Sequence, residues 1–73
     1  MSKQKFYKDL GKRIKELREK KGISLKDFES MDNAFDRAHL SKMENGVRHP
    51  TIYTLQKIAD VLGVDISDFF KSK

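Results

Sequence analysis

Apolar side chains in the first third of the chain recur every three or four positions. The members of this series are Phe6, Leu10, Ile14 and Leu17. A stripe with this spacing is typical of an amphipathic helix, and most of the lysines and glutamates between its members fall elsewhere around that helix. Gly22 follows the series, and glycine favours the position just past a helix end. The pattern therefore predicts a first helix over residues 6–21.

A second, shorter apolar series begins behind Ser24. Its members are Leu25, Phe28 and Met31. The Ser24 hydroxyl can accept a hydrogen bond from a backbone N–H that is free at a helix start. Asp27 follows three residues later, in the place of a shortened capping-box acid. Asp32 and Asn33 both favour turns, so we expect the second helix to end there.

Asp36 is suited to start a third helix. Phe35 before it and Leu40 after it occupy the two positions of a hydrophobic staple, which fixes the angle at which the chain enters the helix. We expect Leu40 and Met43 to face the core and the pair Asn45-Gly46 to close the helix. The residues that remain for its exposed side are Arg37, Ala38, His39, Ser41 and Lys42.

Two further apolar series follow. Thr51 comes directly after Pro50 and is expected to cap a fourth helix that Gly63 ends, while Asp65 is expected to cap a fifth. The apolar members are Ile52, Leu55, Ile58, Ala59 and Leu62 in the fourth helix, and Ile66, Phe69 and Phe70 in the fifth. Because no strand pattern is present and the connections are short, the sequence predicts an all-α fold, a compact five-helix bundle.

Composition narrows the class of protein. Seventy-three residues suffice for one domain with a thin core, and the absence of cysteine excludes disulfides and thiolate metal sites. No apolar run approaches the roughly 18 residues of a membrane span, and no signal-peptide segment begins the chain. We therefore expect a cytoplasmic protein without a membrane anchor. Neither a metal site nor an enzyme is predicted, because ligand clusters and phosphate-cradling glycine loops are absent.

Positive charge is concentrated near the N-terminus. Residues 1–26 carry ten Lys or Arg and three Asp or Glu, residues 27–46 carry two and five, and residues 47–73 carry four and three, for a net charge of +5. A basic excess favours nucleic acid as a partner. Such residues can also simply solvate a helix, which is our interpretation of Lys3, Lys5, Lys8, Lys12 and Arg13.

Two short helices joined by a tight turn, within a five-helix unit, have the layout of a helix-turn-helix domain. The segments LGKRIKELREKKGIS (residues 10–24) and LSKMENGVRHPTIYTLQKIADVLGVDISDFF (residues 40–70), with Phe28 between them, resemble the phage-repressor and Cro-type helix-turn-helix proteins, also called the xenobiotic-response-element family. The resemblance implies a repressor-like domain over residues 6–70. We expect a flexible basic N-terminus at residues 1–5 and a tail at residues 71–73.

The resemblance also implies that the third helix enters the major groove of DNA and that its N-terminal residues contact base edges. By position, these residues are Arg37, Ala38, His39 and Lys42. The chemistry agrees with this assignment, because an arginine can form a two-pronged hydrogen bond to guanine and an alanine methyl can touch a thymine methyl.

Phosphate contacts are expected on either side of that helix. The family resemblance implies that Asn45 and the backbone amides near Gly46 and Val47 contact a phosphate. Arg48 adds a positive charge in the same loop, and Lys26 is a further expected phosphate contact. His49 can add a weaker contact, although a solvent-facing loop residue is the favoured interpretation. Free N–H groups at the starts of the second and third helices also suit phosphate. Arg18 and Glu44 match a family pair that joins the first and third helices, so we expect a partly buried ion pair there.

The function implied is that of a sequence-specific, double-stranded DNA-binding transcription regulator, a repressor that occupies its operator. A homodimer on a palindromic operator would place two recognition helices about 34 Å apart. The C-terminal helix is the expected seam, with Phe70 offered to the partner. We expect a location in the cytoplasm on the nucleoid, and neither a cofactor nor a small-molecule effector.

An alternative is a protein-interaction module, adaptor-like or antitoxin-like, that keeps this fold with weak or no DNA binding. Three departures from the family pattern favour it. Leu25 stands where the family has a phosphate-binding glutamine, Glu29 stands in place of a small alanine, and the stretch from Ser24 to Gly46 is one residue longer than usual. The acidic balance of residues 27–46 points the same way, because acids repel phosphate.

Overall fold

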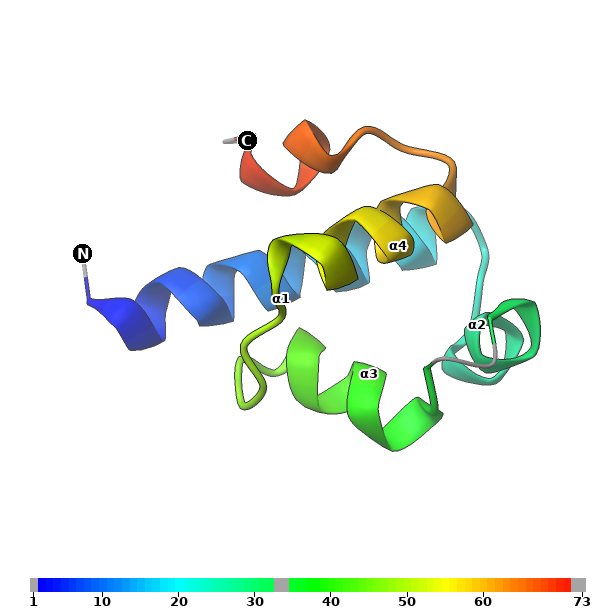
Figure 1. Cartoon of the computed structure of the whole chain (residues 1–73), viewed down its shortest axis with the longest axis horizontal. Helices are drawn as coiled ribbons and strands as arrows, with labels where there is room; N and C mark the ends of the chain where they lie inside the picture. Colours follow the sequence, from blue (N-terminus) through cyan, green and yellow to red (C-terminus); the bar gives the residue numbers. More distant parts are fainter. Residues whose placement is uncertain (1, 33–34, 72–73) are drawn as a thin grey trace.

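Four α-helices and a final 3-10 helix make up the chain that the structure describes (Figure 1). This computed structural model describes residues 2–32 and 35–71, so Met1 of the predicted N-terminus, Asn33 of the predicted turn, and Ser72 and Lys73 of the predicted tail lie outside the described residues. The elements are α1 (Lys3–Lys20), α2 (Leu25–Met31), α3 (Arg37–Glu44), α4 (Ile52–Leu62) and η1 (Ile66–Phe70). The all-helical fold is confirmed, with no strand in the described ranges.

The expected fifth α-helix is instead the short 3-10 helix η1. The Asp68 N–H donates to the Asp65 carbonyl at 2.9 Å, a bond that spans three residues instead of the four of an α-helix. The Asp65 N–H in turn donates to the Asp68 carboxylate at 3.2 Å. With only five residues, η1 is too short to gain from α-helical propagation, which explains the difference from the prediction.

The helices start where the sequence provides capping residues. Ser24 Oγ accepts from the Asp27 N–H at 3.0 Å, and the Ser24 N–H donates to Asp27 Oδ2 at 3.1 Å, so the expected capping box is present. Asp36 and Thr51 cap α3 and α4, each accepting from the backbone N–H three residues further along. These bonds satisfy donors that a helix start leaves free.

α1 begins at Lys3, earlier than the predicted start at Phe6. Ser2 Oγ accepts from the Lys5 N–H at 3.1 Å and caps the helix, and Lys5 Nζ lies 3.3 Å from Asp9 Oδ2 one turn later. Residues 3–5 therefore belong to α1, in addition to the residues predicted for the first helix. The apolar stripe could not indicate this, because the additional turn faces solvent.

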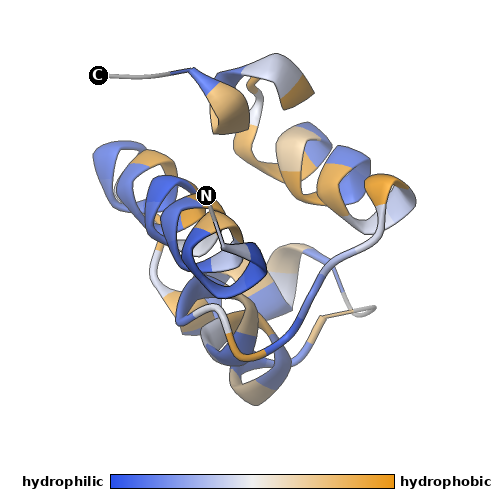
Figure 2. Cartoon of the chain, turned by 90° about the vertical axis from the view of Figure 1, so that its left-hand side faces the viewer, coloured by the Kyte–Doolittle hydropathy of each residue, from blue (hydrophilic) through white to orange (hydrophobic). Residues whose placement is uncertain are grey.

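A cluster of buried apolar side chains draws residues from all five elements and from the segment before α3. Its members are Leu10, Ile14, Leu17, Phe28, Phe35, Leu40, Met43, Leu55, Ile58, Ala59, Leu62 and Phe69. α3 packs against α1 and α2, and η1 packs against α1 and α4. Figure 2 shows hydrophilic residues along much of the outer side of α1. Burial of this cluster is the main force that holds the thin domain together.

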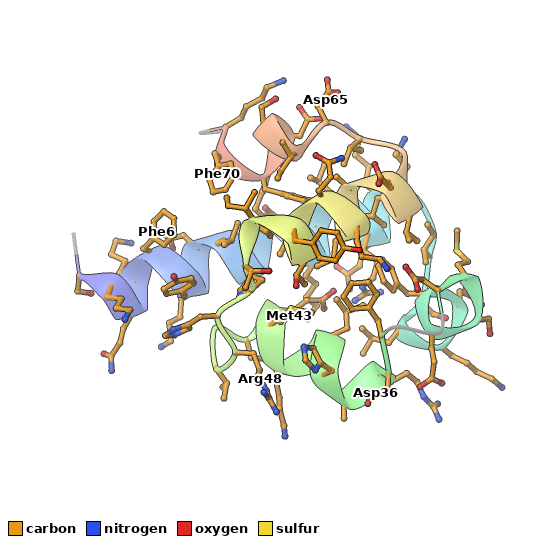
Figure 3. All side chains as sticks on the ribbon, viewed as in Figure 1. Phe6, Asp36, Met43, Arg48, Asp65 and Phe70 are labelled. Carbon is orange, nitrogen blue, oxygen red and sulfur yellow. The ribbon has the colours of Figure 1, made fainter. Side chains whose placement is uncertain are left out.

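Some residues of the predicted apolar stripes lie at the surface. Ile52 is 70% exposed because it is the first residue of α4 and follows the exposed loop 47–49, and Met31, the last residue of α2, is 55% exposed. Phe6 and Phe70 are exposed by 39% and 49% and stack on each other with ring centroids 6.4 Å apart. Figure 3 shows these two rings side by side between α1 and η1. Phe70 thus has a partner within its own chain.

Arg18 of α1 and Glu44 of α3 form the expected ion pair, and both side chains are buried. Arg18 Nε donates to Glu44 Oε2 at 2.7 Å, and Arg18 Nη2 donates to Glu44 Oε1 at 3.1 Å. Arg18 Nη1 also donates to the Ile23 carbonyl at 2.6 Å, in the turn before α2. The Arg18 side chain thus extends from α1 to both α3 and the turn before α2. These charge-assisted hydrogen bonds fix the C-terminal end of α3 relative to α1 and to that turn.

Gly11 allows α1 and α3 to approach closely. A Cβ atom at this position would lie 2.4 Å from the Met43 carbonyl oxygen and 2.5 Å from the Glu44 carbonyl oxygen. Both are backbone atoms, which cannot rotate away as a flexible side chain can. The glycine is therefore required by the helix contact itself and not by a turn.

Candidate nucleic-acid interface

The side of α3 opposite the core carries a row of small and polar residues. The row consists of Ala38, Ser41 and Lys42 and continues to Asn45, the C-cap residue of the helix; their spacing of three and four places them on one face. The opposite face holds the buried residues Leu40, Met43 and Glu44. Figure 3 shows Met43 directed toward the other helices, while Arg48 and Asp36 lie near the two ends of α3 along the edge of the molecule. Of the predicted base contacts, Ala38 and Lys42 lie in this row.

Arg37, the first residue of α3, is exposed but paired. Its Nε lies 3.4 Å from Glu29 Oε1, and its backbone N–H donates to Glu29 Oε2 at 3.1 Å. The Arg37 side chain nevertheless keeps 58% of its surface exposed. Glu29 is therefore neither buried nor unpaired, although it replaces a small residue of the family pattern.

The backbone N–H groups at the start of α3 are partly used within the protein. Asp36 Oδ1 accepts from the His39 N–H at 2.6 Å, and Glu29 accepts from the N–H of Arg37. These two donors are not free for phosphate, which corrects the expectation from the sequence. The His39 side chain is half-buried and lies at the margin of the row.

The loop after α3 folds back on the helix. The backbone N–H groups of Val47 and Arg48 both donate to the Lys42 carbonyl, at 2.9 and 3.1 Å, and the Gly46 N–H donates to the Met43 carbonyl at 3.1 Å. The Val47 amide is thus engaged, and its apolar side chain offers no donor, so the geometry does not support Val47 as a phosphate contact. Asn45 and Arg48 keep exposed side chains.

A shallow groove of about 500 Å³ separates this loop from the start of α1. Its lining consists of Ser2, Gln4, Lys5, Lys8, Asp9, Asn45, Gly46 and Val47. Gly46 has φ 78°, and a Cβ there would lie 3.0 Å from the Lys8 Cα, so the loop and α1 are in close contact. Lys5 and Lys8, interpreted from the sequence as solvating residues, therefore lie beside the predicted phosphate-binding residue Asn45. Lys5 and Lys8 come close to Asn45 only because the N-terminal part of α1 packs against the loop after α3, far along the sequence.

His49 has a structural partner that the sequence did not reveal. Its ring stacks on Tyr7 of α1, with centroids 3.8 Å apart and an interplanar angle of 6°. This stacking holds the loop against α1 at the residue directly after Arg48. We therefore regard His49 as a support for the loop.

Lys26, the remaining predicted phosphate contact, is exposed in the first turn of α2. Next to it, hydrogen bonds from the Ser24 backbone N–H and the Ser24 hydroxyl, opposed by slight desolvation, lower the pKa of Asp27, and the charge of Lys26 lowers it slightly further. Asp27 is therefore an anion beside Lys26 at neutral pH, and part of the positive potential of Lys26 is offset.

Within residues 2–32 and 35–71, no group of three or more His, Cys, Asp or Glu side chains is placed to hold a metal ion. None of the helices in the same ranges is long and apolar enough to cross a membrane.

Comparison with known families decides the class of this domain. A family model described as helix-turn-helix matches residues 14–69, most of the chain and all of the elements from the middle of α1 to η1. The chain belongs to the Cro/C1-type helix-turn-helix family. In a helix-turn-helix, α2 and α3 are the two helices that give the motif its name, and the exposed row lies on the second of them.

Relatives of this helix-turn-helix chain include named regulators. The HTH-type transcriptional regulator y4dJ of Sinorhizobium fredii is 37% identical over 55 residues, which are 75% of this chain and 70% of that protein. The control protein C.MunI of a Mycoplasma species is 36% identical over 61 residues, 82% of this chain and 81% of the relative. The HTH-type transcriptional regulator DdrOP3 of Deinococcus deserti is 32% identical over 62 residues, 85% of this chain but only 47% of that protein.

A solved structure resembles the whole domain. The crystal structure of the DNA-binding domain of BldD superposes with a TM-score of 0.86 at 27% identity, over 94% of this chain and 97% of that one. The helix-turn-helix arrangement of the two is therefore the same.

Proposed function

We propose that this protein is a sequence-specific, double-stranded DNA-binding transcription regulator that acts as a repressor by occupying its operator. The observation that carries the proposal is the row of Ala38, Ser41 and Lys42 on α3, continued by Asn45 at its C-terminal cap, which is turned away from the core. An α-helix fits the major groove, and a row of small and cationic residues lets the helix approach base edges closely. Relatives named as transcriptional regulators and the likeness to a DNA-binding domain support it.

Within this proposal the residues divide into two groups. Arg37, Ala38, His39 and Lys42 contact bases from the N-terminal half of α3, with Ser41 beside them. Lys26, Asn45, Arg48 and the α1 lysines Lys5 and Lys8 contact phosphates. Phosphate contacts set orientation on the duplex and base contacts set sequence preference, so the two groups have different effects when removed.

We further propose that the protein binds a palindromic operator as a homodimer. One domain of this size makes few base contacts, and a second copy doubles them while placing the two α3 helices about 34 Å apart on one face of DNA. The C-terminal element η1 is the proposed seam. Because Phe70 stacks on Phe6, the seam would include both rings.

A second candidate function is that of a protein-interaction module. The pairing of Arg37 with Glu29 favours it, because an acid at the start of α3 reduces attraction to phosphate. In that case α3 would bind the surface of a partner protein, and added duplex DNA would not displace that protein.

One titration separates the two functions. A labelled random-sequence duplex is titrated with protein, by fluorescence anisotropy, at salt concentrations from roughly 50 to 200 mM. A DNA-binding regulator binds at low salt and weakens steeply as salt rises, because phosphate neutralisation releases counterions. Arg48→Ala should weaken binding, whereas the control Lys71→Ala, which removes an equal charge from the η1 side, should not. Absence of binding at the lowest salt would contradict the DNA-binding regulator and favour the interaction module.

A further inference from the structure

We propose that Glu29 positions Arg37 for the recognition of a guanine, an inference that rests on the proposed DNA-binding function. Glu29 lies on α2, and Arg37 is the first residue of α3, across the turn. The two oxygens of one carboxylate contact two parts of the same residue: Oε2 accepts the Arg37 backbone N–H at 3.1 Å, and Oε1 lies 3.4 Å from the Nε of its side chain.

This contact leaves the outer end of the guanidinium available. An arginine presents five N–H donors in one plane, and its approach to Glu29 Oε1 at 3.4 Å is made by Nε. The two Nη groups remain, and together they match the O6 and N7 acceptors of guanine in the major groove. With 58% of the Arg37 side chain exposed, the acid fixes the guanidinium from one side without enclosing it.

The benefit of such a support is orientation and not stability. An exposed ion pair contributes little to folding, and the Glu29 side chain is itself 38% exposed. A free arginine side chain has many rotamers, and only a few of them direct both Nη groups at one base. Glu29 restricts this set before DNA arrives, so less entropy is lost on binding.

Glu29 also acts against non-specific binding. Its negative charge stands at the start of α3, where it reduces the attraction of Arg37 for any phosphate along the duplex. A guanine at the matching position retains its two hydrogen bonds to the Nη groups. The ratio of specific to random binding therefore rises through both effects, which explains how an acid can be useful in this position.

The test compares four proteins in a selection of bound fragments from a random-sequence duplex pool: the natural chain, Glu29→Gln, Arg37→Ala and the double variant. Glu29→Gln keeps the volume of the side chain and removes its charge. Glu19→Gln, at an exposed position of α1, is the matched control for the same change of charge. Thermal melts of each variant establish that the fold is intact.

We expect Glu29→Gln to lose preference at the same base pair as Arg37→Ala, by about three- to tenfold, which is part of what a two-pronged arginine contact provides. Its affinity for random duplex should be unchanged or higher, and the double variant should match Arg37→Ala. Glu19→Gln should keep the natural preference. A Glu29→Gln variant with the natural preference, or with losses that add to those of Arg37→Ala, would overturn the inference while leaving DNA binding intact. Absence of duplex binding by the natural chain would instead overturn the proposed function, and the inference with it.

Discussion

Arg18 and Glu44 differ from the other charged pairs of this domain because their side chains are only 7% and 4% exposed. Lys5 and Asp9 are both exposed, and Lys71 is exposed beside a half-buried Asp68, so water screens the attraction in both pairs. Removing one partner of the buried pair leaves a charge without compensation in the interior. Loss of one partner should therefore lower the stability of the fold more than it changes the exposed surface of α3.

Glu44→Ala should lower the free energy of unfolding by about 3–5 kcal/mol, because it strands the Arg18 guanidinium. Chemical denaturation followed by circular dichroism measures the change. A double variant, Arg18→Met with Glu44→Leu, should recover most of the loss, since it removes both charges at similar volume. A melting curve of Glu44→Ala equal to that of the natural chain would contradict the structural role of the pair.

Arg37 and Arg48 should differ in the kind of binding they support. Arg37→Ala should relax sequence preference at one base pair, at a cost of about 1–3 kcal/mol for the preferred site. Arg48→Ala should weaken binding to all duplexes alike and lower the salt slope by about one. Anisotropy titrations with a selected site and with random duplex measure both effects. Equal losses for the two variants on every sequence would show that the division into base and phosphate contacts is wrong.

Asp27 makes the stability of α2 depend on pH. Hydrogen bonds from Ser24 lower its pKa below the ordinary value of about 3.9, so the folded state favours the carboxylate. The stabilisation is complete above that value and disappears as the pH falls through the lower pKa of the folded state. Asp27→Asn should therefore be less stable than the natural chain at pH 7, with the two melting temperatures converging below about pH 4. A constant difference down to acid pH would contradict this assignment.

At the scale of elements, the helices were largely predictable from local chemistry. Ser24, Asp36 and Thr51 each cap a helix, as their positions before apolar series indicated, and Gly63 ends α4 with φ 71°. The start of α1 was missed because Ser2 precedes a turn without a buried apolar residue. Ile52 was predicted to face the core but is exposed. A helical stripe shows which residues share a face of the helix, but it does not show whether another element packs over the end of that face.

The contacts of the site were less predictable, because they join distant parts of the chain. Ala38 and Lys42 share a face through helical spacing alone, and the same rule indicates Ser41. By contrast, the pairing of Glu29 with Arg37 depends on how the turn between α2 and α3 is folded. The position of Lys8 beside Gly46 depends on how α1 crosses the end of α3. Neither arrangement leaves a periodic signal in the sequence.

Gly11 provides a test of the contact between α1 and α3. In the middle of an exposed helix, replacing glycine with alanine usually increases stability by about 0.5–1 kcal/mol. Here Gly11→Ala should instead decrease it by about 1–3 kcal/mol, because the added methyl meets the backbone of Met43 and Glu44. Urea unfolding measures the sign of the change in the free energy of unfolding. Gly22→Ala, at a positive φ with open space around it, is the control for strain without a clash. An increase in stability for Gly11→Ala would show that the two helices are further apart.

At the scale of the whole molecule, the core and the proposed interface lie on different sides of α3. Leu40, Met43 and Glu44 anchor the helix to the domain, and Arg18 fixes its C-terminal end. The loop after α3 is held by the Lys42 carbonyl and by the stacking of His49 on Tyr7. A helix supported in this way can present its outer row without rearrangement, which reduces the entropy lost when a partner binds.

The central claim is that the outer row of α3 contacts duplex DNA. The most direct measurement is the change in backbone amide signals of isotope-labelled protein, by nuclear magnetic resonance, when a duplex is added at low salt. The account predicts the largest shifts from Arg37 to Lys42 and from Asn45 to Arg48, with smaller shifts at Lys5 and Lys8 and none at Ile66 to Ser67. Shifts confined to α4 and η1, with α3 unchanged, would contradict it.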